Sequence, residues 1–263
     1  MFDYDNDGDL DAYFVQAQML GESSGTGEAL FPPPGPLPLS GSLYRNDLSV
    51  QTDGSRLLRF TEVTEESGLK VDGYGMGVAA GDINNDGWVD LYLTHFGANQ
   101  LFRNNGDGTF SNISQQSGTD DPQWSVSAAF VDYDRDGWLD LFVANYVSYN
   151  VDTSRTCTTV SGAPDYCSPQ VYPSQPDRLY RNLGDGTFAD VTATALVGGE
   201  FGPGLGVTAA DFNGDGWLDI YVANDGEENQ LWVNQRDGRF PVSYTHLRAP
   251  ETEAALVCRL LLE

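Results

Sequence analysis

Short apolar runs rich in aromatic and β-branched residues recur along the chain, and polar segments rich in glycine separate them. These runs come in pairs that flank a short acidic segment, as at 78–80 and 91–94, at 128–131 and 141–144, and at 207–210 and 220–223. Apolar runs of this length, bounded by Gly, Asn and Asp, are typical of β-strands. We therefore predict that each acidic segment connects two strands rather than two helices.

A second pattern follows each predicted strand pair, with an Asp-Gly turn between two further short β runs. It reads N-Q-L-F-R-N-N-G-D-G-T-F at 99–110, R-L-Y-R-N-L-G-D-G-T-F at 178–188 and N-Q-L-W-V-N-Q-R-D-G-R-F at 229–240. Residues 43–46 with 60–64 form a stretched version of the same pattern. Asp-Gly between β runs indicates a hairpin, which is favoured here over a further metal site. Each unit thus contains four predicted strands, and such units in tandem are typical of β-propeller blades.

We accordingly predict an all-β fold, a partial β-propeller of about four four-stranded blades. The blades are expected at about 1–66, 73–117, 124–194 and 203–242. The acidic segments begin at residues 3, 82, 132 and 211, which fits a period of about fifty residues with two insertions. Met1 and Phe2 stand where the other copies have a strand, so we expect the chain to begin within a repeat, as a fragment without its export signal.

The two insertions and the end of the chain depart from the repeat. The first, about 16–41, is rich in proline and is interpreted as a surface excursion of polyproline II character. The second, about 148–177, carries Cys157 and Cys167, which close a short loop and suggest a disulfide. A zinc site would need two more soft ligands, and none lies nearby. Residues 243–263 no longer follow the repeat and are interpreted as an artefactual tail, with at most a frayed helix.

The four acidic segments share the pattern D-x-[DN]-x-D-G-x-x-D. Oxygen donors at positions 1, 3, 5 and 9, with a backbone carbonyl at position 7, match the six to eight oxygen ligands that Ca²⁺ prefers. The glycine at position 6 is expected to take a positive φ, so that the chain can wrap an ion. The predicted ligands are Asp3, Asp5, Asp7, Asp9 and Asp11; Asp82, Asn84, Asp86, Trp88 and Asp90; Asp132, Asp134, Asp136, Trp138 and Asp140; and Asp211, Asn213, Asp215, Trp217 and Asp219.

Calcium explains these loops better than solvated turns do, because four copies keep the same donors, glycine and apolar flank. Two carboxylates at ~4 Å repel by about 4 kcal/mol at an effective dielectric of ~20, so the loops should splay apart without a cation. A helix-loop-helix calcium hand is excluded, since its acid at position 12 is replaced by Phe14, Leu93, Val143 or Val222. We therefore predict about four structural Ca²⁺ ions, each bound between neighbouring strands.

The formal net charge of −26, from 39 acidic and 13 basic residues, argues against nucleic acid or an anionic membrane as partner. No apolar run is long enough to span a bilayer, so we expect no membrane insertion. The two histidines, His95 and His246, are far apart in sequence, and His95 is interpreted as structural. No nucleophile motif and no catalytic constellation is recognisable.

These residues together resemble a known family. The D-x-[DN]-x-D-G-x-x-D loops between strands are similar to the FG-GAP/VCBS repeats of integrin α-subunit propellers. Tyr166-Cys167-Ser168-Pro169, followed by the segments 177–182 and 184–188, resembles the cartilage-acidic-protein-like, ASPIC/UnbV-associated group. The resemblance covers residues 1 to about 242. It implies a secreted or surface-exposed protein with a seven-bladed, calcium-stabilised propeller, whereas only about four blades and no ASPIC/UnbV domain are present here.

The function expected from these features is a non-enzymatic, extracytoplasmic scaffold that binds a protein or glycan ligand, as in adhesion. The alternative is a fragment of a propeller-type carbohydrate-active enzyme, a lyase or hydrolase. A pocket with two free carboxylates and a histidine would favour that enzyme. A third possibility, a structural matrix component, is not separable from adhesion by sequence.

Overall fold

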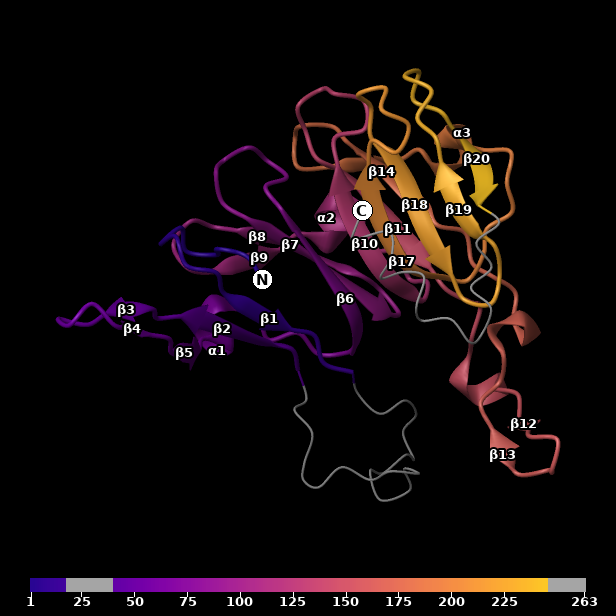
Figure 1. Cartoon of the computed structure of the whole chain (residues 1–263), viewed down its shortest axis with the longest axis horizontal. Helices are drawn as coiled ribbons and strands as arrows, with labels where there is room; N and C mark the ends of the chain where they lie inside the picture. The colour runs from indigo at the N-terminus through magenta and orange to yellow at the C-terminus, as the bar shows by residue number, and fades with distance from the viewer. Residues whose placement is uncertain (18–39, 246–263) are drawn as a thin grey trace.

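The computed structural model describes residues 1–17 and 40–245, and these residues form a series of antiparallel β-sheets joined by loops and one-turn helices (Figure 1). The all-β fold with propeller-type sheets is confirmed. Most of the predicted proline-rich excursion, residues 18–39, lies outside the described residues. The same holds for 246–263, which includes His246 and most of the predicted tail.

Four sheets follow one another along the chain, and the strand order within each is nearly that of the sequence. The first contains β1 (Ala12–Phe14), β2 (Ser42–Asn46) and β5 (Phe60–Glu62). The second contains β6 (Tyr74–Gly81), β7 (Asp90–Phe96), β8 (Gln100–Asn104) and β9 (Phe110–Asn112). The third contains β10 (Ser125–Val131), β11 (Asp140–Asn145), β14 (Arg178–Asn182) and β15 (Phe188–Asp190). The fourth contains β17 (Gly204–Ala210), β18 (Asp219–Asn224), β19 (Asn229–Trp232) and β20 (Phe240–Thr245), and β16 (Leu196–Val197) adds to it in parallel beside β20.

The first sheet has three named strands rather than four. In place of a first strand, Phe2 forms an isolated bridge with Asp11. The acidic loop between them nevertheless has the same position as in the other repeats, because its ends are held by backbone hydrogen bonds in both directions between Phe2 and Asp11.

Two small hairpins project from these sheets (Figure 1). One consists of β3 (Ser49–Val50) and β4 (Arg56–Leu57), within the stretched hairpin of the first repeat. The other consists of β12 (Cys157–Thr158) and β13 (Pro164–Asp165), with the 3₁₀ turns η2 (Val151–Thr153) and η3 (Pro169–Val171) on either side. The predicted disulfide is confirmed there: Cys157 and Cys167 are bonded, with Cα atoms 5.2 Å apart.

Three one-turn helices that the sequence patterns did not predict follow the last strand of the first three repeats. They are α1 (Thr64–Ser67), α2 (Ser114–Ser117) and α3 (Thr192–Ala195). Each begins with a buried hydroxyl residue that accepts a hydrogen bond from a backbone N–H of the third strand, at 2.8–2.9 Å. The available signal was a Thr or Ser four residues after the hairpin phenylalanine, but this residue acts through a tertiary contact that periodicity does not reveal.

The core consists of three apolar clusters, one between each pair of successive sheets. The innermost strands pack most closely, with β10 lying between β6 and β17. Gly77 permits this approach, because a Cβ atom there would lie 2.5 Å from the carbonyl oxygen of Val126 in the next sheet. The sheets are therefore stacked face to face, and every acidic loop emerges at the same end of its sheet, between the first and second strands.

Candidate metal centres

Each acidic loop takes the same backbone path. The glycines at position 6, Gly8, Gly87, Gly137 and Gly216, have φ between 85° and 91°, as predicted. Position 4 is also left-handed: φ is 57° at Asn6, 56° at Asn85, 61° at Arg135 and 74° at Gly214. The sequence analysis missed this second left-handed position, although Asn and Gly at position 4 are the residues that tolerate it best.

The carboxylate at position 1 is fixed by the backbone of its own loop. Asp82 accepts hydrogen bonds from the N–H groups of Asp86, at 3.1 Å, and Gly87, at 2.8 Å. Asp3 and Asp211 accept the equivalent pair, and Asp132 accepts from Gly137 at 3.2 Å. The position-5 carboxylate in turn accepts from the N–H at position 7 in all four loops. These contacts hold the side-chain oxygens on one side of the loop.

The aspartate at position 9 lies beneath its loop, and all four copies are completely buried; they are Asp11, Asp90, Asp140 and Asp219. In Asp140, Oδ2 accepts from the N–H of Tyr133 at 3.2 Å and Oδ1 accepts from the N–H of Asn182 at 2.8 Å. The other three make the same two contacts. Burial raises the pKa of both Asp90 and Asp140 to about 7, and an adjacent cation would favour their charged form.

The asparagine that ends the third strand of the first three repeats, and that follows β19 two residues after its end in the fourth, is a site residue to which the sequence analysis assigned no role. Its backbone N–H binds the position-9 carboxylate, and its side-chain Nδ2 donates to the carbonyl oxygen one residue before that aspartate. In three repeats Nδ2 also donates to the carbonyl at position 2 of the preceding loop. These bonds are Asn104 to Tyr4 at 2.8 Å, Asn182 to Ile83 at 2.8 Å and Asn234 to Tyr133 at 2.9 Å.

Two loops contain carboxylate oxygens that lack any partner. Asp5 Oδ1 and Asp132 Oδ1 are buried and accept no hydrogen bond within the described residues. Asp3, Asp5 and Asp11 each offer an oxygen within 4.8 Å of the others, and so do Asp132, Asp134 and Asp136. Burial, followed by the charge of Asp7, raises the pKa of Asp5. An unpartnered buried carboxylate is costly unless a cation binds it, so the donor set of these two loops fits a hard divalent ion.

The other two loops have asparagine at position 3. Asn84 Oδ1 accepts from the N–H of Asp86 at 3.2 Å, and Asn213 Oδ1 accepts from Asp215 at 2.9 Å. Asp134 Oδ1 accepts from Asp136 in the same way, at 3.2 Å, so the amide oxygens occupy the place of a carboxylate oxygen. An amide oxygen is also an acceptable calcium ligand. The donor set of these loops therefore fits the same ion, although the loop carries one negative charge fewer than a loop with aspartate at position 3.

Arginine side chains already neutralise part of two loops. Arg181 Nε lies 2.8 Å from Asp134 Oδ2, and its Nη2 lies 3.2 Å from Asp136 Oδ2. Arg236 Nη2 lies 3.0 Å from Asp215 Oδ2, and this ion pair, after the hydrogen bond from Trp217, lowers the pKa of Asp215. A metal ion at these loops would share its carboxylates with a guanidinium group.

The structure thus brings positions 1, 3 and 9 together in the first loop, as Asp3, Asp5 and Asp11, and positions 1, 3 and 5 together in the third, as Asp132, Asp134 and Asp136. In the second and fourth loops the side chains at positions 1 and 3 accept from the same N–H at position 5. Their role as ligands, and that of the position-7 carbonyls, remains a prediction. His95 lies outside these loops: it is buried, its ring Nδ1 lies 3.2 Å from the carbonyl oxygen of Leu93, and burial lowers its pKa. Among the described helices, none is long and apolar enough to cross a membrane.

Comparison with known proteins shows which family these repeats match. The FG-GAP-like repeat pattern matches residues 82–143, 161–222 and 211–255. Cartilage acidic protein 1 from Homo sapiens is 43% identical over 58 residues, 22% of this chain and 9% of that protein. The Mus musculus protein is 36% identical over 76 residues, 29% of this chain and 12% of that protein. The matched segments therefore span about a tenth of these curated relatives.

Among solved structures, the chain is similar to a lectin from Agrocybe aegerita, described as recognising non-reducing terminal N-acetylglucosamine. The TM-score is 0.37 at 17% identity, covering 78% of this chain and 46% of the lectin. The repeat pattern matches more than half of the chain and falls on the observed second, third and fourth sheets and their acidic loops. The chain therefore belongs to the FG-GAP-like repeat family.

Proposed function

We propose that this propeller-type chain is a calcium-stabilised, non-enzymatic scaffold that acts outside the cytoplasm and binds a protein or glycan ligand. The observation that supports it most directly is the pair of buried, unpartnered oxygens on Asp5 and Asp132, each within a cluster of three carboxylates. Four such loops at the same end of four stacked sheets suit a structural ion better than a catalytic one, because each also ties together two strands of its own sheet.

Calcium would contribute an appreciable part of the stability. Extracellular sites typically bind with dissociation constants of about 10⁻⁴–10⁻³ M. At a free concentration of ~10 times the dissociation constant, each site adds about 1.4 kcal/mol. Four sites would together add on the order of 6 kcal/mol, comparable with the ~5–15 kcal/mol stability of a whole domain.

An extracytoplasmic location is supported by the disulfide between Cys157 and Cys167, since disulfides persist mainly in oxidising compartments. The relatives' name, which refers to cartilage, agrees with this location.

A ligand surface is supported at the end of the sheets opposite the acidic loops. There the disulfide-bearing insertion meets the fourth sheet: Gln170 Nε2 donates to the carbonyl oxygen of Gly226 at 2.9 Å, and Tyr146 Oη donates to Asp225 at 2.6 Å. A cavity of about 400 Å³ lies beside this junction, lined by three amide side chains, three glutamates and Phe201, together with Gly202 and Gly226. Amide groups next to an aromatic ring can hydrogen-bond and stack against polar ligands such as sugars.

Calorimetric titration of the 263-residue chain with calcium, paired with melting curves in calcium and in chelator, tests the proposal. We expect about four ions per chain, and a higher melting temperature in calcium. Titration with magnesium is the control, because Mg²⁺ demands a smaller octahedral site and should bind more weakly. A chain that takes up no calcium, or that melts identically in chelator, would refute the metal role.

A further inference from the structure

In each of the first three acidic loops, the side chain at position 4 contacts the loop of the next repeat. Asn6 Nδ2 donates to the carbonyl oxygen of Gly87 at 3.0 Å, and Asn85 Nδ2 donates to that of Gly137 at 2.9 Å. The two partners are separated by 81 residues in the first pair and by 52 in the second. Both carbonyls belong to the glycine at position 6, so two successive junctions repeat one contact.

The third junction uses a different side chain at the same position. The guanidinium carbon of Arg135 lies 4.5 Å from the centre of the Trp217 ring, which is at position 7 of the fourth loop. Its Nη2 atom also lies close to Gly216, because a Cβ atom on that glycine would be 3.3 Å away from it. A guanidinium group over an indole ring is a favourable contact. All three contacts therefore run from position 4 of one loop to position 6 or 7 of the next.

These contacts depend on the left-handed backbone at position 4. The angle φ is 57° at Asn6, 56° at Asn85 and 61° at Arg135. Residues other than glycine adopt this conformation at a cost, which is smaller for Asn than for Arg. In each loop the conformation belongs to the path that gathers the side-chain oxygens on one side. An ion that holds those oxygens would therefore also hold position 4.

At the receiving loop, the contact fixes a peptide group that lies next to predicted ligands. In the third loop, the carbonyl of Gly137 accepts from Asn85. The N–H of the same peptide group belongs to Trp138 and donates to Asp136 Oδ1 at 3.0 Å. Asp136 is the predicted ligand at position 5, and the carbonyl of Trp138 is the predicted ligand at position 7. The contact from Asn85 thus orients the part of the third loop that supplies two ligands.

We propose that the side chains at position 4 couple the four loops, so that an ion in one loop raises the affinity of the next loop for calcium. Asn6, Asn85 and Arg135 are then positioning residues and not ligands. Without an ion, the carboxylates of a loop repel one another, and position 4 can leave the left-handed region. An ion fixes position 4, and the contact transmits this ordering to the next loop as a coupling free energy. This inference rests on the calcium role proposed above.

Asn85→Gly removes the contact at the second junction and preserves the second loop itself. Glycine adopts the left-handed conformation freely, and the fourth loop already has Gly214 at this position, with φ of 74°. Asp86→Ala instead removes a predicted ligand of the second loop. One exposed hydrogen bond corresponds to about a threefold change in an equilibrium constant. We therefore expect Asp86→Ala to weaken metal binding at the third loop about threefold when Asn85 is present, and not at all in the Asn85→Gly background.

Terbium luminescence measures the third loop by itself in the full 263-residue chain. Tb³⁺ prefers oxygen ligands as Ca²⁺ does, and a tryptophan close to the ion excites its emission. Trp88→Phe combined with Trp217→Phe leaves Trp138 as the reporter among the acidic loops, and both substitutions retain the backbone carbonyl at position 7. Titration of this chain with Tb³⁺, with each of the two test substitutions and with both together, gives the four affinities that the comparison needs.

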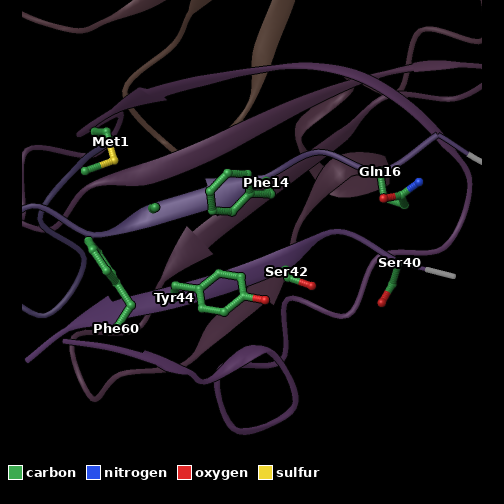
Figure 2. Close-up of a pocket in the computed structure, with 8 residues that line it drawn as sticks. Met1, Phe14, Gln16, Ser40, Ser42, Tyr44 and Phe60 are labelled. Carbon is green, nitrogen blue, oxygen red and sulfur yellow. The ribbon is translucent and has the colours of Figure 1, made fainter. Parts of the chain in front are cut away.

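Two controls remove a side-chain amide outside the acidic loops. Asn105→Gly changes an exposed asparagine in the hairpin of the second repeat, where its amide contacts Thr109. Gln16→Ala removes an amide that donates to the carbonyl oxygen of Ala17, beside an apolar depression on the first sheet (Figure 2). Neither control should alter the effect of Asp86→Ala on the third loop.

The possible outcomes separate the coupling from the calcium role. If the third loop binds terbium equally well with and without Asp86→Ala, the coupling is overturned and the calcium role stands. If Asp86→Ala weakens the third loop equally with and without Asn85→Gly, the coupling does not pass through Asn85, and the proposal is again overturned. A chain that binds neither calcium nor terbium would overturn both the coupling and the proposed function.

Discussion

The side-chain amide of Asn182 donates a 2.8 Å hydrogen bond to the carbonyl oxygen of Ile83, which lies 99 residues earlier in the preceding repeat. The backbone N–H of the same asparagine binds the buried carboxylate of Asp140 at 2.8 Å. One residue thus joins its own acidic loop to the loop before it. Asn104 and Asn234 make the same connection, so the four loops are linked in series.

Asn182→Ala should destabilise the chain whether or not calcium is bound. The change leaves the carbonyl oxygens of Ile83 and Leu139 without this donor inside the fold, and an unsatisfied buried polar group costs about 1–3 kcal/mol. Urea denaturation in chelator and in calcium measures the change in unfolding free energy. Asn105→Ala is the control, because the Asn105 amide contacts Thr109 at an exposed turn and should matter by less than about 0.5 kcal/mol. Equal effects of the two substitutions would contradict the inter-repeat role.

Asp86→Ala should remove most of the calcium-dependent stability of the second loop. Its carboxylate is exposed and bound to Trp88 N–H and to the Asn84 amide, so its loss in chelator should have little effect. In calcium we expect a loss of about 1.4 kcal/mol, the contribution of one site at ~10 times its dissociation constant. Melting temperatures in both buffers provide the measurement. An equal drop in both would show that Asp86 acts only through the turn.

Asp107→Ala is the matched control for that measurement. Asp107 also accepts hydrogen bonds within a tight turn, from the N–H and the hydroxyl of Thr109, but it lies in the Asp-Gly hairpin of the same repeat. We expect it to lower stability similarly in calcium and in chelator. A selective loss in calcium would instead assign a metal to the hairpin.

Arg181→Gln should tighten calcium binding at the third loop. The guanidinium group forms ion pairs with the carboxylates of Asp134 and Asp136, and its positive charge would repel an incoming cation. Because Arg181 is largely exposed, the expected gain is modest, about 1 kcal/mol or roughly fivefold in affinity. Calorimetry resolves it as one site of four that shifts. Arg103→Gln is the comparison, since Arg103 holds the same position in the second repeat; unchanged or weaker binding in Arg181→Gln would contradict the competition.

Asp177→Asn should raise stability at alkaline pH and change it little in acid. Asp177 is completely buried where the neighbouring repeats have Asn99 and Asn229, and its Oδ2 has no hydrogen-bond partner among the residues that the structure describes. Burial raises its pKa from 3.8 to about 8, so the unfolded chain loses this proton at much lower pH than the folded chain. Stability should therefore decline as pH rises from about 4 to about 8.

The variant should lack that contribution, because asparagine is neutral throughout this range. Melting curves of both proteins at matched pH, in calcium so that the loop carboxylates stay charged, isolate the effect of position 177. Arg178 and the backbone N–H of Asn145 are the groups that favour the charged form of Asp177. If the difference in melting temperature between the unchanged chain and the variant did not grow above neutral pH, Asp177 would already be ionised in the folded chain.

What the sequence determined was local. The strands flanking each loop, the Asp-Gly hairpins, the glycine turn at position 6 and the Cys157–Cys167 pair all depend on residues close together in the chain. Local spacing was also enough to bring Asp132, Asp134 and Asp136 into one cluster. Period and spacing describe such features well, because neighbouring residues have few ways to be arranged.

Only the tertiary structure decided what happens between repeats. It joined Asn182 by a hydrogen bond to Ile83, 99 residues earlier, and it anchored α2 through the hydrogen bond from the Leu101 N–H to Ser114. It buried Asp177 with an Oδ2 atom that has no hydrogen-bond partner among the described residues. It also made Phe14 a surface residue, although the equivalent Leu93 is part of the core. The physical reason is that the burial of a side chain depends on which sheet lies opposite it. Residues at the same position of the sequence repeat, such as Phe14 and Leu93, therefore differ in burial when different elements pack against them.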